Sequence, residues 1–476
     1  MCRKKGVLNL PSDFRTEKDL IGEKEIPNDA YYGINSDRAL ANFNVNNKKV
    51  NLNLIYSMVI VKKAAAMAHK KVKEMDEKKA TAIIKACDEI LDKKFDSEFI
   101  TGYLQGGAGT STNMNVNEVI ANRAIEILGG SKGDYSIIHP VQDINMSQST
   151  NDVYPTALRI AAIKLLRPLA DALAKLQEAL QIKENDFSDI LMLGRTELMD
   201  ALPMMAGQSF GAYAKAIARD RWRIYKVEER LREINIGGTA IGTGINASDE
   251  YIFAVTDILQ DITGLGLART DYPMDTTQNM DVFVEVSGLL KACAVNLIKI
   301  SNDIRLLSSG PRGGFSEIVL EELQAGSSIM PGKVNPVICE MIAQISMRVM
   351  ANDTAISLAA SFGQLQLNAF SPLIAESILE SLEILTKGIV IFKEKCIDSL
   401  KINSKKCLEH LNCSTALATA LVNHIGYDKA SYIAKKALKE NKSIRTLIIE
   451  EKLLTEEEVD KILNPYEITK PGIPGL

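Results

Sequence analysis

The segment "NMDVFVEVSGLLKACAVNLIKISNDIRLLSS" at residues 279–309 constrains the fold of this chain more than any other stretch. Its apolar residues recur at helical spacing and cover nearly the whole circumference, while its charges are few. A helix of this length spans about 45 Å at about 1.5 Å per residue, and a helix that is apolar all round must be covered on most sides. One chain seldom covers so long a helix, so the segment predicts a multi-chain helix bundle.

Two further long helices are predicted from the same periodicity. One runs from about Asp152 towards Ile182, and the other from about Pro203 to Ile234. Proline is sparse, and the alternating runs that would indicate strands are few and short. The chain is therefore expected to be mainly α-helical, and its 476 residues suffice for two to three domains.

Composition excludes several classes of partner. The net charge is −4, the pI is near 5.8 and no dense Lys/Arg tract occurs, so neither nucleic acid nor an anionic membrane is expected. No apolar run reaches the length of a membrane span, and residues 1–14 lack the apolar core of a signal peptide. The seven cysteines form no C-x-x-C pair, which favours reduced thiols in the cytoplasm. The four histidines show no metal-ligand spacing, so a protein-bound zinc ion is not expected.

Between the helical segments lie turns that share one chemistry. Each is rich in hydroxyls, amides and glycines, and carboxylates are limited to Glu118, Asp152 and Glu197. For any single turn, the simpler interpretation is that Ser, Thr and Asn act as helix caps and turn formers. Together, the turns predict a site that holds a small polyanion through neutral donors. They are "GGAGTSTNMNVNE" (106–118), "NMSQSTND" (145–152), "GRTEL" (194–198) and "GGTAIGTGINAS" (237–248).

A fifth polar loop, "GSSIMPGKVNP" at residues 326–336, adds a cation to this set. Asn335 followed by Pro336 predicts a helix start, so the two serines and Lys333 lie on a glycine-hinged loop at a helix N-terminus. The loop is not a phosphate-binding P-loop, because the spacing is too long by one residue and no Ser or Thr follows the lysine. The "GQSFG" at 207–211 fits a nucleophile elbow only if a buried strand precedes it, and a position for Ser209 inside a helix is favoured instead.

"GSSIMPGKVNP" resembles the signature loop of the aspartase/fumarase superfamily, and "GTSTNMNVNE" and "SQSTND" resemble its two other blocks. The similarity runs from "EKDLIGEKEIPNDAYYGI" to the closing "ITKPG", which is nearly the whole chain. The fold that this implies is mainly α, with three domains at 1–148, 149–404 and 405–476. The middle domain would supply long helices to a twenty-helix core in a homotetramer, and each active site would be built from three chains.

Within the superfamily, three positions separate the possible activities. "GTSTN" (109–113) is similar to aspartate ammonia-lyases, whereas class II fumarases usually carry Gln-Ser in place of Ser111-Thr112. Fumarases have a histidine where this chain has Glu197, and their "HPND" reads "HPVQ" here (139–142). The resemblance therefore implies elimination of ammonia from L-aspartate, without a required cofactor. The alternatives are a fumarate hydratase and a non-catalytic helical assembly protein, and activation by a divalent metal cannot be read from the sequence.

The reaction indicates a role for each polar residue. Removing a proton next to a carboxylate leaves a dianionic enediolate. Hydrogen-bond donors must therefore already be in place around the carboxylate oxygens on which the charge develops. By resemblance Ser327 is the base, against the simpler interpretation that its hydroxyl only bonds locally. Glu197 either binds the substrate ammonium or is a solvated carboxylate. The expected substrate-binding residues are Thr110, Ser149, Thr150 and Ser328 around one carboxylate, Lys333, Asn335 and Thr196 around the other, and Asn151 at the amino group.

Overall fold

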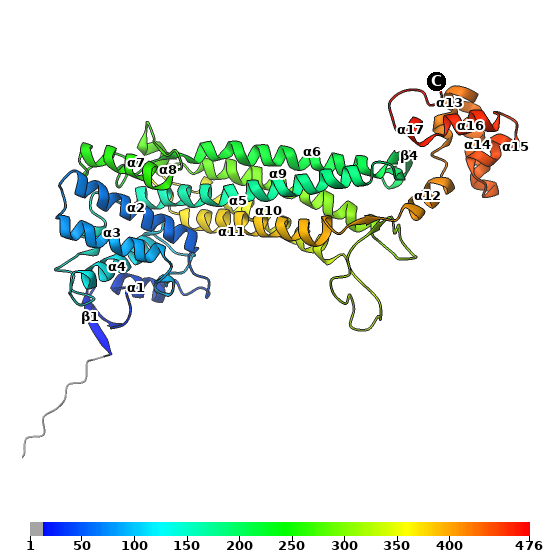
Figure 1. Ribbon diagram of the computed structural model, residues 1–476. Helices are drawn as coiled ribbons and strands as arrows, with labels where there is room; N and C mark the ends of the chain where they lie inside the picture. Colours follow the sequence, from blue (N-terminus) through cyan, green and yellow to red (C-terminus); the bar gives the residue numbers. More distant parts are fainter. Residues whose placement is uncertain (1–12) are drawn as a thin grey trace, which may run out of the picture. The chain divides into compact units, whose positions relative to one another are not determined.

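The computed structural model describes residues 13–476, so the expectation about a signal peptide falls almost wholly outside the described part. Within that part the chain is mainly α-helical, as predicted, and its strands pair only into two-stranded sheets (Figure 1). None of the described helices combines the length and apolarity that a bilayer span requires.

The described chain divides into two compact units. The first holds residues 13–169, 223–291 and 348–384, and the second holds 170–222, 292–347 and 385–476. This division cuts through the long helices, so the predicted three-domain boundaries at 148 and 404 remain a prediction. The long helices are α5 (Thr150–Asp186), α6 (Ala206–Val227), α9 (Asp281–Leu307), α10 (Val337–Ser361) and α11 (Ser371–Phe392).

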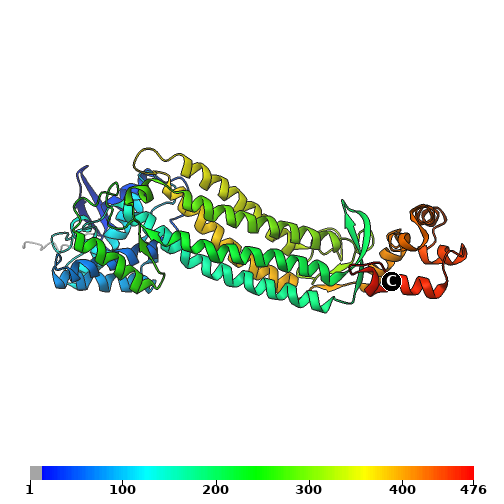
Figure 2. The ribbon, with the colours of Figure 1, turned by 90° about the horizontal axis from the view of Figure 1, so that it is seen from above.

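The first unit has a helical core around α2 (Leu52–Lys71), which packs against both α3 (Glu77–Leu91) and α7 (Asp249–Thr263), while α3 packs against α4 (Thr110–Ile127). Segments of the five long helices run side by side within it, as they do within the second unit (Figures 1 and 2). Its other elements are β1 (Phe14–Lys18), β2 (Glu23–Pro27), α1 (Ile34–Asn42), α2 (Leu52–Lys71), α3 (Glu77–Leu91), η1 (Asp96–Glu98), α4 (Thr110–Ile127), η2 (Pro140–Ile144), η3 (Glu228–Leu231), β5 (Glu233–Ile234), α7 (Asp249–Thr263), β6 (Ala268–Arg269) and α8 (Pro273–Gln278).

The second unit adds one hairpin, a second antiparallel pair of short strands that are distant in sequence, and the C-terminal helices. Leu411, Leu421, Ile433, Leu447 and Val459 are buried together and hold those helices in one cluster. The elements of this unit, besides the long helices, are β3 (Leu191–Thr196), β4 (Met199–Met205), β7 (Ile318–Val319), η4 (Lys393–Ile397), β8 (Lys401–Ile402), α12 (Ser404–Cys413), α13 (Ala418–Ile425), α14 (Tyr427–Glu440), α15 (Ile444–Glu450), α16 (Glu456–Ile462) and α17 (Pro465–Ile468).

The long apolar segment is confirmed as a helix, α9, which covers 27 residues of the predicted stretch. Phe283, Leu290, Leu297 and Ile304 are fully buried in the chain, whereas Val295 on the same helix is 49 % exposed. Exposed apolar side chains on a long helix are typical of a surface that another chain covers.

The helix predicted over 203–234 is shorter than expected. Residues 199–205 form strand β4, which pairs with β3, and the helix α6 that follows ends at Val227. A strand therefore does precede "GQSFG", contrary to the sequence interpretation. It is one strand of a two-stranded hairpin and not the central strand of a sheet, and Ser209 lies inside α6 as expected. The elbow interpretation thus stays excluded.

Candidate active site

The loop 326–336 is closed by hydrogen bonds across its base. The backbone N–H of Gly326 donates to the Lys333 carbonyl at 2.7 Å, and the Asn335 side-chain amide donates to the Gly326 carbonyl at 2.9 Å. Helix α10 begins at Val337, directly after Pro336. The helix start is thus where the sequence predicts it, but the Asn335 amide closes the loop where an N-cap side chain was expected.

The Ser327 hydroxyl is bonded within this loop. Its Oγ accepts hydrogen bonds from the backbone N–H groups of Ile329 at 3.2 Å and Met330 at 3.0 Å. This is the local bonding that the simpler interpretation predicts. The same two donors stabilise negative charge on Oγ, which a serine needs in order to act as a base. In the single chain Ser328 and Lys333 are exposed, so the loop is open to water.

Thr196 and Glu197 lie at the tip of the β3–β4 hairpin. Thr196 pairs with Met199, and the two intervening residues, Glu197 and Leu198, have φ values of 53° and 66°. Positive φ at both positions is what a type I′ hairpin turn requires, and for residues other than glycine it stores roughly 1–3 kcal/mol of strain each. Both residues are exposed. Strain of this kind at an exposed carboxylate is typical of functional turns.

A buried carboxylate, Glu317, links this hairpin to the chain segment that precedes the serine loop. It accepts from Arg195 Nη1 and Nη2 at 2.9 and 2.7 Å, and its Oε1 lies 2.7 Å from His410 Nδ1 on α12. Arg195 directly precedes Thr196, and Glu317 directly precedes β7. The bidentate pair therefore fixes the predicted 194–198 turn against the chain at Glu317 within the second unit. No sequence motif predicted this pair.

The remaining predicted residues lie in the first unit. Helix α5 begins at Thr150, and Ser149 Oγ accepts from the Asn151 backbone N–H at 3.2 Å. The Asn151 amide donates to the Ala240 carbonyl at 2.7 Å, so the 237–248 turn lies against this helix start. Thr110 opens α4 and donates to the Gly107 carbonyl at 2.7 Å. Most of the predicted 106–118 turn is therefore helical, because α4 takes in everything after Gly109.

Two fully buried charged side chains lie beside these donors. Asp152, on the first turn of α5, accepts from the backbone N–H of Ser149 at 2.9 Å. Lys62 of α2 donates to Asn145 Oδ1 at 2.6 Å and to Gln148 Oε1 at 3.0 Å. Burial raises the pKa of Asp152 to about 7 and lowers the pKa of Lys62 to about 7. From the sequence, Asp152 was recognised only as one of three carboxylates in the polar turns, and Lys62 was not predicted to have a role.

The predicted site residues are thus divided between the two units of one chain. Thr110, Ser149, Thr150 and Asn151 belong to the first unit, and the others to the second. Glu340, on the first turn of α10 next to the serine loop, pairs with Arg305 at 3.7 Å. In residues 13–476, no group of three or more His, Cys, Asp or Glu side chains is arranged to hold a metal ion.

This arrangement can be compared with known proteins. Residues 22–351 match the family described as "Lyase", and residues 417–470 match "Fumarase C C-terminus". The chain belongs to the aspartase/fumarase superfamily. Its polar loops, its long helices and its C-terminal helical cluster are therefore those of a lyase, as the resemblance of the sequence motifs predicted.

Similarity to individual superfamily members extends over nearly the full length. The chain is 46 % identical to the aspartate ammonia-lyase of Bacillus subtilis (strain 168), covering 98 % of this chain and 99 % of the relative. It is 45 % identical to the aspartate ammonia-lyase of Helicobacter pylori (strain ATCC 700392 / 26695), covering 96 % and 98 %.

Solved structures of the superfamily share the fold. The fumarate lyase:delta crystallin of Brucella melitensis bound to cobalt superimposes with a TM-score of 0.93 at 44 % identity, covering 96 % of this chain and all of that one. The class II fumarase of Schistosoma mansoni superimposes with a TM-score of 0.92 at 35 % identity, covering 96 % and 99 %.

Proposed function

We propose that this protein is an aspartate ammonia-lyase, which eliminates ammonia reversibly from L-aspartate to give fumarate. The observation that carries the proposal is 46 % identity, over 98 % of the chain, to a relative with that name. The "GTSTN" run at 109–113 and Glu197 support ammonia over water as the leaving group, because both depart from the fumarase pattern.

Ser327 is the base in the proposed mechanism. It takes the proton from the carbon next to one carboxylate of L-aspartate, and the electron pair moves onto the oxygens of that carboxylate to give the enediolate. The backbone N–H groups of Ile329 and Met330 support the role, because they lie within 3.2 Å of Oγ and favour its alkoxide. Closure of the loop about Gly326 and Gly332 excludes water from the bound substrate.

Neutral hydroxyls receive the charge that develops on the reacting carboxylate. Thr110, Ser149, Thr150 and Ser328 supply these donors, and such preorganised donors are worth most where water is excluded. Collapse of the enediolate then forms the double bond of fumarate and expels ammonia from the neighbouring carbon.

The second carboxylate and the amino group need separate partners. Lys333 and Asn335 bind the second carboxylate, with Thr196 assisting, and a charge-assisted bond from lysine is the strongest of these contacts. Asn151 orients the amino group, and Glu197 accepts a hydrogen bond from the substrate ammonium. A negative charge near a dicarboxylate is tolerable only with such a cation between them.

The active unit is proposed to be a homotetramer with a twenty-helix core, in which three chains build each site. Support comes from apolar side chains that stand exposed along the long helices of one chain, including Val295, Met347 and Leu358. The exposed serine loop and hairpin tip agree with a site that partner chains complete. The enzyme is proposed to need no cofactor and to work in the cytoplasm.

The proposed activity is tested by comparing two substrates on one preparation. We expect L-aspartate to yield fumarate and ammonia in equal amounts, and L-malate to yield fumarate at a far lower kcat/KM. Ultraviolet absorbance follows fumarate in both reactions. A higher kcat/KM for L-malate would identify a fumarate hydratase, and no fumarate from either substrate would identify a non-catalytic protein.

A further inference from the structure

The Asp152 carboxylate joins two chain segments that the sequence separates by 85 positions. Its Oδ1 accepts from Ser149, and its Oδ2 accepts from the backbone N–H groups of Gly237 at 3.1 Å and Thr239 at 3.0 Å. The Asp152 side chain is completely buried. One carboxylate thus satisfies three backbone donors, and the two in the turn that also accepts from the Asn151 amide are buried.

The turn that Asp152 holds is strained. Gly237 has a φ of 87° and Thr239 a φ of 53°, and the second value is costly for a residue that carries a Cβ. Removing the acceptor would leave the N–H groups of both residues buried without a partner and would release this conformation.

Lys62 anchors the chain on the other side of Ser149. Its ammonium contacts Asn145 and Gln148, whose loop leads directly into Ser149. Asn145 Oδ1 also accepts from the amides of Asn113 at 3.0 Å and Asn117 at 3.2 Å, both on α4, the helix that Thr110 opens. These contacts therefore tie the loop that leads into Ser149 and Thr150 to α4, the helix that begins at Thr110.

We propose that Asp152 and Lys62 are positioning residues, which hold Ser149, Thr150 and Thr110 in place for the enediolate. The proposal rests on the proposed function. Charged groups in a protein interior are costly, since each gives up its hydration. Lys62 and Asp152 attract each other electrostatically, but the described contacts include no direct salt bridge between them. This cost of burial is offset by hydrogen bonds. Asp152 accepts from three backbone N–H groups, and Lys62 donates to two side-chain amide oxygens, so each charge holds the loops around Ser149 in one arrangement.

The test is the substitution Asp152→Asn. The asparagine keeps one acceptor oxygen but turns an NH₂ group towards backbone N–H groups, which it cannot accept from. The Ser149 segment should therefore shift, and the hydroxyls of Ser149 and Thr150 should shift with it. Misplacement of donors that act on developing charge lowers kcat, and we expect a loss of about 10–100-fold. The dissociation constant of succinate, an unreactive four-carbon dicarboxylate, should stay within about threefold of wild type because ground-state contacts depend less on these donors.

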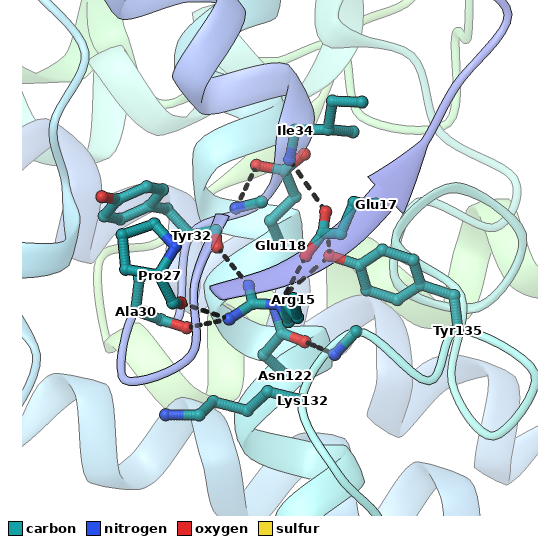
Figure 3. Close-up of polar contacts among 12 residues, drawn as sticks. Arg15, Glu17, Pro27, Ala30, Tyr32, Ile34, Glu118, Asn122, Lys132 and Tyr135 are labelled. Atoms are coloured by element: carbon teal, nitrogen blue, oxygen red, sulfur yellow. Dashed lines mark hydrogen bonds and ion pairs between the residues drawn. The ribbon is translucent and has the colours of Figure 1, made fainter. Parts of the chain in front are cut away.

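Glu118→Gln is the matched control. Glu118 of α4, which lies near Glu17 and Ile34 in Figure 3, is also buried. It accepts three backbone N–H bonds, from Gly33 at 2.9 Å, Asn35 at 2.8 Å and Ser36 at 3.1 Å. Glu118 ends the predicted 106–118 segment, but it lies within α4 and is not one of the proposed substrate contacts. Its three backbone donors belong to the start of α1. We expect both substitutions to lower Tm, and only Asp152→Asn to lower kcat. Equal losses of kcat in the two variants, measured at equal intervals below Tm, would overturn the proposal.

A second variant covers the case in which Asp152→Asn does not fold. Lys62→Met removes the ammonium but keeps an unbranched side chain, and it should also lower kcat about 10-fold or more without loss of succinate binding. A folded Lys62→Met with wild-type kcat would overturn the role of that residue. Wild-type protein that releases no ammonia from L-aspartate would refute the proposed function itself, which separates the two failures.

Discussion

Replacing Ser327 with alanine is expected to abolish turnover of L-aspartate almost completely. The variant should still fold, assemble and bind succinate, because the hydroxyl contacts only two backbone N–H groups of its own loop. The loss should fall on kcat, since proton removal takes place only in the transition state. If Ser327→Ala keeps more than about a tenth of the wild-type kcat, a barrier change under about 1.4 kcal/mol, another group is the base.

Ser328→Ala is the matched control for this experiment. Ser328 is adjacent, chemically identical and exposed, and it is proposed to supply one of several hydrogen bonds to the enediolate. Removing one such donor costs on the order of 10²–10³ in rate, so Ser328→Ala should retain more activity than Ser327→Ala. The two serines have the same side chain and are adjacent in the chain. A large difference in kcat between the two variants would therefore reflect different roles in the reaction.

Replacing Lys333 with alanine is expected to raise the KM for L-aspartate steeply and to lower kcat. Lys333 supplies the only cation among the proposed substrate contacts, and losing a charge-assisted bond to a buried carboxylate costs about 2–5 kcal/mol. The same loss should appear in the dissociation constant of succinate. Lys405→Ala, at an exposed lysine of α12, controls for the change in net charge. An unchanged KM in a folded Lys333→Ala enzyme would show that the second carboxylate binds elsewhere.

The long helices were predictable because their signal is local. Helix α9 could be predicted because apolar residues recur at every turn. Its ends at Asp281 and Leu307 each lie two residues inside the predicted segment 279–309. The start of α6 was not predictable in this way. "LPMMAGQS" contains good helix formers, and residues 199–205 become a strand only because β3 lies beside them to pair with.

In the candidate site, too, the residues in short local motifs could be predicted from the sequence, and the residues that make long-range contacts could not. The serine loop, the hairpin residues and the helix start at Thr150 could be found from short motifs of hydroxyls, amides and glycines. The groups that hold them could not. Arg195 and Glu317 are 122 positions apart, and Lys62 lies 86 positions from Gln148. No pattern within one segment specifies such contacts, which arise only when the helices pack.

The proposal as a whole, an aspartate ammonia-lyase whose sites are shared between chains, is tested most directly by mixing two inactive variants. Ser327→Ala removes the base from the second unit, and Thr150→Val removes a donor from the first. The two proteins are dissociated, mixed in equal amounts and reassembled, with each variant alone treated identically, and fumarate formation from L-aspartate is then measured. If Ser327 and Thr150 of one site come from different chains, about one quarter of the sites in random tetramers hold both intact residues, so about a quarter of wild-type activity returns. Activity no higher than the mean of the two variants would mean that one chain supplies both residues, and would contradict the shared site.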